Sequence, residues 1–183
     1  EKTFRQEYEA TFETYSGLIY YNFDPLRNVK HSDTEITDRT LIHAAIDFNV
    51  DPMSCALATV QDNHIHIFAE IILSGSNTYE LAEEINTRFP NNRIWAYPDA
   101  SGQARKTNSN TSDHNILRQA GFVLKVGRSN PPVVDRIAAV NSSLLSSTGD
   151  VKLTIAPRCK QVIKGLNNQV YKEGTRIPDK DSG

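Results

Sequence analysis

Three consecutive strand patterns begin at Leu41. Residues 41–49 (LIHAAIDFN) are apolar enough for a central strand that is buried on both faces. Residues 53–61 (MSCALATVQ) and 64–73 (HIHIFAEIIL) are two further strand patterns, and the pair Asp62-Asn63 separates them. A short Asp/Asn turn between two such runs is typical of a β-hairpin. The pattern therefore predicts three consecutive antiparallel strands.

Helical patterns alternate with shorter strand patterns in the rest of the chain. Ser76 or Asn77 can cap a helix that runs through Phe89, and residues 93–97 predict a fourth strand. The later elements follow the same order: a helix from Ser112 or Asp113, a strand at 122–126, a helix from Pro131-Pro132, a strand at 151–155 and a helix from Pro157 to about residue 171.

This order of elements predicts an α/β fold with a mixed sheet of five strands or more and helices on both faces. Residues 1–40 show no sustained period, apart from a possible short helix at 1–12, and we interpret them as an arm or connector. Residues 41–183 have no internal linker and no repeat, so we expect a single domain there.

Composition and charge exclude few classes of protein. The 183 residues suffice for one domain, and 38% hydrophobic with 23% charged residues is typical of a globular protein. The net charge of −2 disfavours a constitutive high-affinity DNA-binding module, but a carboxylate metal site adds negative charge of its own. The chain shows no signal peptide, no apolar run of ~18 residues and no ATP-binding P-loop pattern. Its two cysteines lack metal-ligand spacing, which favours a reduced cytosolic protein.

Two aspartates follow apolar strand patterns, and they carry the candidate chemistry. Asp47 ends the first strand and Asp99 follows the fourth. If these strands are neighbours, the two carboxylates face each other at one edge of the sheet, where sites form in open α/β sheets. Like charges at such a distance repel unless a cation lies between them, and oxygen ligands suit Mg²⁺ or Mn²⁺. From the residues alone, two loop-capping aspartates remain an equally good interpretation.

Several segments resemble the nuclease half of tailed-phage large terminases, and together they span the chain. Residues 45–52 (AIDFNVDP) are similar to the first nuclease motif of that family, and residues 97–102 (YPDASG) to the second. Residues 4–8 (FRQEY) resemble the segment that joins the ATPase half to the nuclease half. Residues 132–145 and 155–159 also follow the terminase pattern.

The resemblance implies a ribonuclease H-like fold, two Mg²⁺ or Mn²⁺ ions held by Asp47 and Asp99, and cutting of double-stranded viral DNA during packaging. It also implies a terminase ATPase domain, a small terminase subunit and a portal protein as partners, in the host cytoplasm and without a membrane. The family's third carboxylate lies in a C-terminal His-x-x-Asp-Ala pattern. We expect that pattern beyond Gly183, with Asp181, or Asp179, as a weak substitute.

Other polar residues are secondary candidates. Arg105 and Lys106 follow Asp99 in a polar loop, and Arg128 and Lys125 follow the fifth strand; phosphate contacts and solvated loops explain them equally well. The remaining candidates are better explained as ordinary surface, strand-edge or helix-terminal residues: Glu70, His64, His66, His114, and Asp135 with Arg136.

Two other functions remain open. One is a different ribonuclease H-like nuclease, such as a junction resolvase or a cutter of RNA/DNA hybrids, and the other is a non-catalytic docking module of a packaging complex. A nicking assay on junction or hybrid substrates distinguishes such a nuclease from a terminase nuclease. A lack of any Mn²⁺-dependent cleavage favours the docking module.

Overall fold

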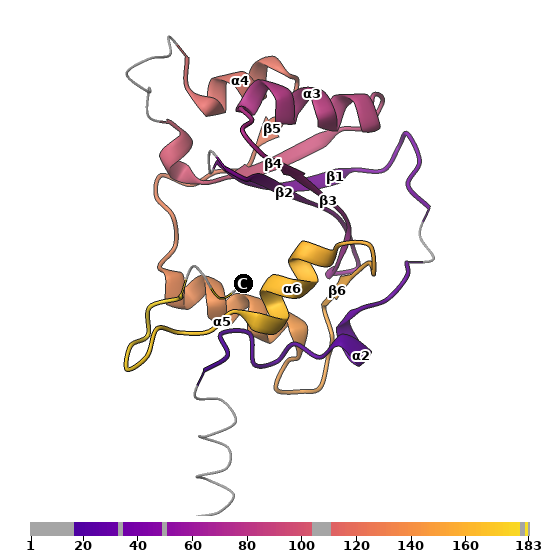
Figure 1. Cartoon of the computed structure of the whole chain (residues 1–183). Coiled ribbons are helices and arrows are strands. Elements are labelled where there is room, and N and C mark those ends of the chain that lie inside the picture. Colours follow the sequence, from indigo (N-terminus) through magenta and orange to yellow (C-terminus); the bar gives the residue numbers. More distant parts are fainter. Residues whose placement is uncertain (1–16, 33–34, 49–50, 104–110, 180–181, 183) are drawn as a thin grey trace, which may run out of the picture.

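Six strands form one mixed sheet in the part of the chain that the structure describes, residues 17–32, 35–48, 51–103, 111–179 and 182. The structure is a computed structural model (Figure 1). The strands are β1 (Ile42–Asp47), β2 (Met53–Gln61), β3 (His64–Leu73), β4 (Ile94–Pro98), β5 (Val123–Leu124) and β6 (Leu153–Ile155). The helices are α2 (Pro25–Asn28), α3 (Thr78–Arg88), α4 (Asp113–Gln119), α5 (Val133–Leu144) and α6 (Lys160–Asn168), with a 3-10 helix η1 at Ala100–Gln103.

The strand order across the sheet is β5-β4-β1-β2-β3-β6. β1, β2 and β3 are consecutive antiparallel neighbours, as the sequence predicts. Asp62 and Asn63 join β2 to β3 with φ angles of 49° and 64°, the left-handed region that a tight two-residue hairpin turn requires. The predicted α/β class, a mixed sheet of at least five strands with helices on both faces, is confirmed.

β1 and β4 are parallel neighbours, and their pairing fixes the geometry of the candidate site. His43 lies opposite Trp95, and Ile46 lies opposite Pro98. Parallel strands end at the same edge of a sheet. The residues that follow β1 and β4 along the chain therefore lie side by side at that edge.

The larger hydrophobic core covers one face of the sheet. Ile42, Ala44 and Ile46 of β1 are buried in it, together with residues of α3 and α4 such as Leu81 and Leu117. Figure 1 shows α3 and α4 on this side of the sheet. Side chains alternate between the two faces of a strand, so the odd-numbered residues of β1 point the other way.

We call the opposite side the cleft face. It carries His43, Ala45 and Asp47 of β1 with Trp95 and Tyr97 of β4, all of them half-buried or exposed. The helices α5 and α6 lie on this side (Figure 1). They pack through a second core around β6 rather than flat against β1 and β4.

Leu144, Leu153, Ile155 and Cys159 are buried in this second core. Burial and the charge of Glu70 raise the pKa of the Cys159 thiol to about 11, so it stays protonated at neutral pH. Cys55, in the larger core, is also a free buried cysteine. The structure thus gives both cysteines a packing role and no disulfide between them.

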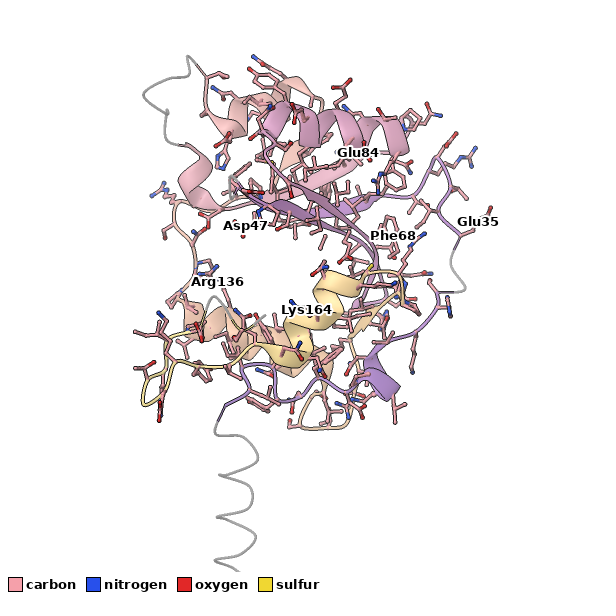
Figure 2. All side chains as sticks on the ribbon, in the orientation of Figure 1. Glu35, Asp47, Phe68, Glu84, Arg136 and Lys164 are labelled. Atoms are coloured by element: carbon pink, nitrogen blue, oxygen red, sulfur yellow. The ribbon has the colours of Figure 1, made fainter. Side chains whose placement is uncertain are left out.

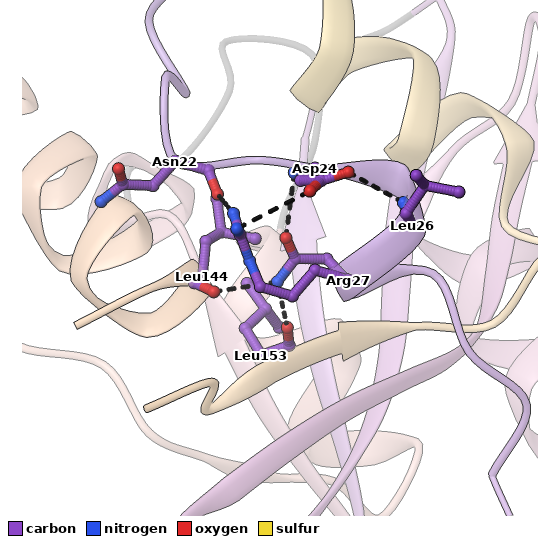
Figure 3. Close-up of polar contacts among 7 residues, drawn as sticks. Asn22, Asp24, Leu26, Arg27, Leu144 and Leu153 are labelled. Carbon is purple, nitrogen blue, oxygen red and sulfur yellow. Dashed lines mark hydrogen bonds and ion pairs between the residues drawn. The ribbon is translucent and has the colours of Figure 1, made fainter. Parts of the chain in front are cut away.

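Residues 17–32 pack into the second core rather than lying loosely on the surface. Ile19 is buried, and Val29 forms a bridge to Ile155. Asn28 is fully buried, and its Nδ2 donates to the backbone oxygens of Leu144 and Leu153, at 3.0 and 3.1 Å (Figure 3). One side chain therefore joins this segment to α5 and β6. A connector spanning residues 1–40 and a separate domain from 41 stay a prediction.

We expect Asn28→Ala to lower the free energy of unfolding by about 2 kcal/mol, because it leaves two buried carbonyl groups with one partner fewer each. Chemical denaturation measures this loss. Asn86→Ala is the matched control, since the exposed Asn86 donates a single side-chain bond, to the Ala120 oxygen at 3.1 Å. A loss no greater than that of the control would show that the Asn28 amide contributes little.

The structure differs from the sequence prediction mainly at the ends of elements. The fifth strand spans only Val123–Leu124, and the last helix begins at Lys160 and ends at Asn168. The short α2 and η1 were not predicted. The possible helix at 1–12 lies outside the described residues. Among the described residues, no helix combines the length and apolar character needed to cross a membrane.

Candidate active site

Asp47 and Asp99 lie at the same edge of the sheet. Asp47 is the last residue of β1, and Asp99 directly follows β4. Because Ile46 pairs with Pro98 in parallel register, the next residue on each strand is Asp47 and Asp99. Neighbouring strands are separated by about 4.8 Å. The predicted neighbourhood of the first and fourth strands is confirmed, while a metal-binding or catalytic role for the two aspartates stays a prediction.

A cleft of about 400 Å³ opens beside Asp47 on the cleft face. Its floor is made of small residues, Ala45 on β1 and Ser54 and Ala56 on β2. Tyr97 stands at one side. The opposite side is formed by Glu70, Ile72, Gln161 and Val162. The exposed Asp47 therefore faces a groove between the sheet and the start of α6 (Figure 2).

The Asp99 side chain is held in place by a loop that comes from much later in the sequence. Asn130 Nδ2 donates to Asp99 Oδ1 at 2.6 Å. The Asn130 Oδ1 in turn accepts a hydrogen bond from the Ala100 backbone at 2.9 Å. This contact fixes the position of one Asp99 oxygen. Asn130 was not a candidate from the sequence, because Asn130-Pro131 indicates only a loop.

His114 supports the same turn through a second contact. It is buried, and its Nε2 lies 2.9 Å from the backbone oxygen of Asp99. A carbonyl oxygen only accepts, so Nε2 carries the proton. The sequence interpretation of His114 as a surface residue was wrong: α4 begins directly after its Ser112 cap and turns the imidazole inward.

Gly102 allows close packing between the two segments that carry the aspartates. A Cβ atom at this position would overlap Cε2 of Phe48 and would lie 2.9 Å from Cδ2 of His114. Phe48 directly follows Asp47, and the Phe48 and His114 rings lie 6.0 Å apart. The turn after Asp99 and the residue after Asp47 thus meet at a position where no side chain fits.

Glu70 lines the cleft, but its carboxylate has a structural partner. Its two oxygens accept hydrogen bonds from the backbone N–H groups of Gln161 and Val162, at 3.0 and 2.9 Å. These N–H groups belong to the first turn of α6, where backbone donors lack partners within the helix. Glu70 on β3 therefore positions the start of α6 over the cleft.

The oxygen chemistry of Asp47 and Asp99 fits a hard divalent cation such as Mg²⁺ or Mn²⁺. Among the described residues, no group of three or more His, Cys, Asp or Glu side chains is close enough to hold a metal. The described residues thus supply Asp47 and Asp99 at the edge of the sheet, while the Glu70 carboxylate in the cleft is bonded to the start of α6. Asp181, the weak third candidate, lies outside the described residues, and Asp179 donates its backbone N–H to the Val170 oxygen at 2.8 Å after α6.

The other sequence candidates are spread over the surface. Arg128 is exposed in the loop after β5, while Arg105 and Lys106 lie outside the described residues. Asp135 and Arg136 are exposed in the first turn of α5. His66 Nδ1 lies 2.9 Å from Thr154 Oγ1, at the other end of β3 from Glu70.

We expect the protein to lose stability when the pH falls from about 7.5 to about 5.5. Burial, followed by the charges of His64 and Arg158, lowers the pKa of His66, and burial also lowers that of His43. The unfolded chain then binds more protons than the folded protein in this range, so stability rises with pH. Thermal unfolding at several pH values measures the slope, which His66→Gln should reduce. An equal slope in the variant would exclude His66 as a cause.

Solved structures of phage large terminases have the same fold. The large terminase of a thermophilic bacteriophage, in complex with ADP, superposes with a TM-score of 0.70 at 18% identity, over 90% of this chain and 41% of that chain. The P22 large terminase nuclease domain matches with a TM-score of 0.69 at 12% identity, over 91% of this chain and 86% of that one.

The large terminase nuclease from the thermophilic phage G20c with bound magnesium matches less closely, with a TM-score of 0.59 at 11% identity, over 91% of this chain and 88% of that chain. No protein-family model matches the sequence, and neither does any curated protein. The chain spans less than half the length of the ADP-bound large terminase. Its fold is that of the large terminase nuclease domains, which confirms the resemblance at the level of structure.

Proposed function

We propose that this chain is the nuclease part of a phage large terminase and cuts double-stranded viral DNA during genome packaging, as a Mg²⁺- or Mn²⁺-dependent endonuclease in the host cytoplasm. The observation that carries the proposal is the placement of Asp47 and Asp99 side by side at the ends of parallel β1 and β4, in a fold shared with terminase nucleases. A nuclease of the same fold binds magnesium.

In this proposal Asp47 and Asp99 hold two divalent ions. Such ions supply an activated water and neutralise charge on the phosphodiester as its bond breaks. The chain's own residues prepare the place for that chemistry. Asn130 restricts the rotation of the Asp99 carboxylate, and Gly102 with Phe48 and His114 keeps the two acidic segments together.

The cleft face supplies room for the DNA backbone. Its floor of Ala45, Ser54 and Ala56 lets a phosphate approach the sheet near Asp47. Arg136, in the first turn of α5, lies on the same side of the sheet as Asp47 (Figure 2). We propose that Arg136 and Arg128 contribute phosphate contacts, with Arg105 and Lys106 from the loop after η1.

The proposed partners follow from the larger proteins that share this fold. The large terminase solved with ADP extends well beyond the part that matches this chain. We propose that this chain likewise works beside an ATPase domain, together with a small terminase subunit and a portal protein. The motor would hold the DNA, and a domain with a net charge of −2 need not bind it tightly alone.

A plasmid-cleavage assay tests the proposal. Supercoiled DNA is incubated with Mn²⁺, Mg²⁺ or a chelator, using both the chain of residues 1–183 and a longer form that continues past Gly183. We expect Mn²⁺-dependent nicking and linearisation of duplex DNA. Faster cutting of four-way junctions or RNA/DNA hybrids would favour another ribonuclease H-like nuclease, and no cleavage by either form would favour a docking module.

A further inference from the structure

Three aromatic rings form a continuous strip on the cleft face beside the candidate active site. The His43 ring lies 5.6 Å from Tyr97 in a stacked arrangement and 5.6 Å from Trp95 in an edge-on one. His43 Nδ1 and the Tyr97 hydroxyl are 2.8 Å apart, which fixes the orientation of the tyrosine ring. We call these three residues the aromatic strip.

The hydrophobic cores do not account for the strip. Tyr97 keeps 38% of its surface exposed and lines the cleft with Asp47, and none of the three rings belongs to either buried cluster. Two adjacent cations accompany it: Lys125 Nζ lies 3.8 Å from the centre of the Trp95 ring, and the guanidinium carbon of Arg93 lies 5.9 Å from it. Burial lowers the pKa of His43 and so favours its neutral form, and the positive charge beside the strip comes from Lys125 and Arg93.

The strip leads directly to Asp47 and Asp99, which we call the acidic pair. Trp95, Tyr97 and Asp99 are alternate residues along β4 and its continuation, and His43, Ala45 and Asp47 are their neighbours on β1. Four residues of strand span about 13 Å. A bound chain that places one phosphate at Asp47 and Asp99 would therefore run its next units over Tyr97 and then toward Lys125, which lies over Trp95.

An exposed ring such as that of Tyr97, with cations close to it, is the kind of surface that single-stranded nucleic acids use. Bases stack on the aromatic rings while the cations contact the backbone. In a closed duplex the bases are stacked inside the helix and cannot reach a ring on a sheet surface. A rigid Tyr97 loses little conformational freedom when a base stacks on it.

We propose that Tyr97, held in place by His43, stacks on an unpaired base of the strand next to the phosphate that is cut, while Lys125 and Arg93 beside Trp95 contact the backbone of that strand. This nuclease would thus engage a locally separated single strand. The inference rests on the proposed nuclease function and adds to it the form of the substrate. It gives the cleft face a preference for unpaired over paired DNA.

Trp95 is the chain's single tryptophan and is therefore a specific reporter of this surface. Its fluorescence is followed in chelator at low salt, where no cleavage occurs, during titration with a short oligothymidylate and with a blunt-ended duplex of two strands. We expect the single strand to quench Trp95 and to bind about tenfold more tightly than the duplex. Equal binding of both, or no quenching by either, would overturn the proposal.

Variants of Tyr97 separate stacking from general charge attraction. Tyr97→Leu removes the ring and should weaken single-strand binding about tenfold, whereas Tyr97→Phe keeps the ring and should stay within about twofold. Tyr79→Leu is the control, because Tyr79 is 56% exposed on α3, on the other side of the sheet, and should leave binding unchanged. Binding by Tyr97→Leu equal to that of the control would contradict a stacking role.

The binding assay and the plasmid assay can fail independently. Single-strand binding that depends on Tyr97, without Mn²⁺-dependent cleavage, would support the strip and reject the nuclease. Cleavage of duplex DNA that is unchanged in Tyr97→Leu, with no preference for unpaired DNA, would support the nuclease and reject the strip.

Discussion

Replacing Asp47 with asparagine should reduce Mn²⁺-dependent DNA cleavage about a thousandfold. The substitution keeps the shape of the side chain but removes the negative charge that balances a cation. Charge stabilisation by a catalytic metal is worth several kcal/mol, and each tenfold in rate corresponds to about 1.36 kcal/mol. Single-turnover cleavage rates of the purified protein measure the effect, and Asp99→Asn should give a loss of similar size.

Asp62→Asn is the matched control for this prediction. Asp62 lies in the β2–β3 turn, at the opposite end of the sheet, and asparagine tolerates its left-handed φ of 49°. Cleavage and the thermal midpoint should both stay near their wild-type values. If Asp47→Asn kept full activity while folding normally, the acidic pair would have no part in the reaction.

Gly102→Ala should lower the free energy of unfolding by about 3 kcal/mol and slow cleavage as well. The new methyl group would overlap the Phe48 ring and lie 2.9 Å from the His114 ring, and strain of this kind typically costs about 1–3 kcal/mol. Either ring must move, and each supports a segment that carries one aspartate. Denaturant titration and cleavage rates at saturating Mn²⁺ measure the two effects.

Gly165→Ala is the control, and we expect it to change the free energy of unfolding in the opposite direction. Gly165 lies within α6, and a Cβ atom there would meet no other atom within 4 Å. Alanine in a helix is favoured over glycine by about 0.5–1 kcal/mol, so this variant should be slightly more stable. If both glycine variants changed stability alike, the packing of Phe48 and His114 against Gly102 would not be the cause.

The sequence predicted those features of the fold that depend on local patterns. The apolar run along β2, the alternation along β3 and the Asp62-Asn63 turn between them predict the hairpin that the structure shows. The aspartates stand out because each ends an apolar strand. Their neighbourhood needed one further assumption, that the first and fourth strands pair, and the sheet confirms it.

The contacts that position the site could not be predicted, because they join residues far apart in the sequence. Asn130 reaches Asp99 across 31 residues, and Glu70 caps α6 across about 90. Both are common polar residues with no local signal for these partners. His114 was misjudged because its burial depends on how α4 packs against the sheet, not on its own helix pattern.

The aromatic strip could not be predicted for the same reason, because it also joins residues far apart in the sequence. His43 and Tyr97 are separated by 54 residues and meet only because β1 and β4 are parallel neighbours in this register. A shift by one residue would turn Tyr97 toward the core beneath α3. The register of β1 and β4 therefore places Asp47 beside Asp99 and also places the aromatic strip on the cleft face.

The most direct test of the acidic pair is a crystal of the protein grown or soaked in Mn²⁺, with anomalous diffraction measured near the manganese edge. We expect an anomalous peak between the carboxylates of Asp47 and Asp99 that disappears in Asp47→Asn. Carboxylates that point apart with no peak between them, in crystals that bind manganese elsewhere, would contradict it.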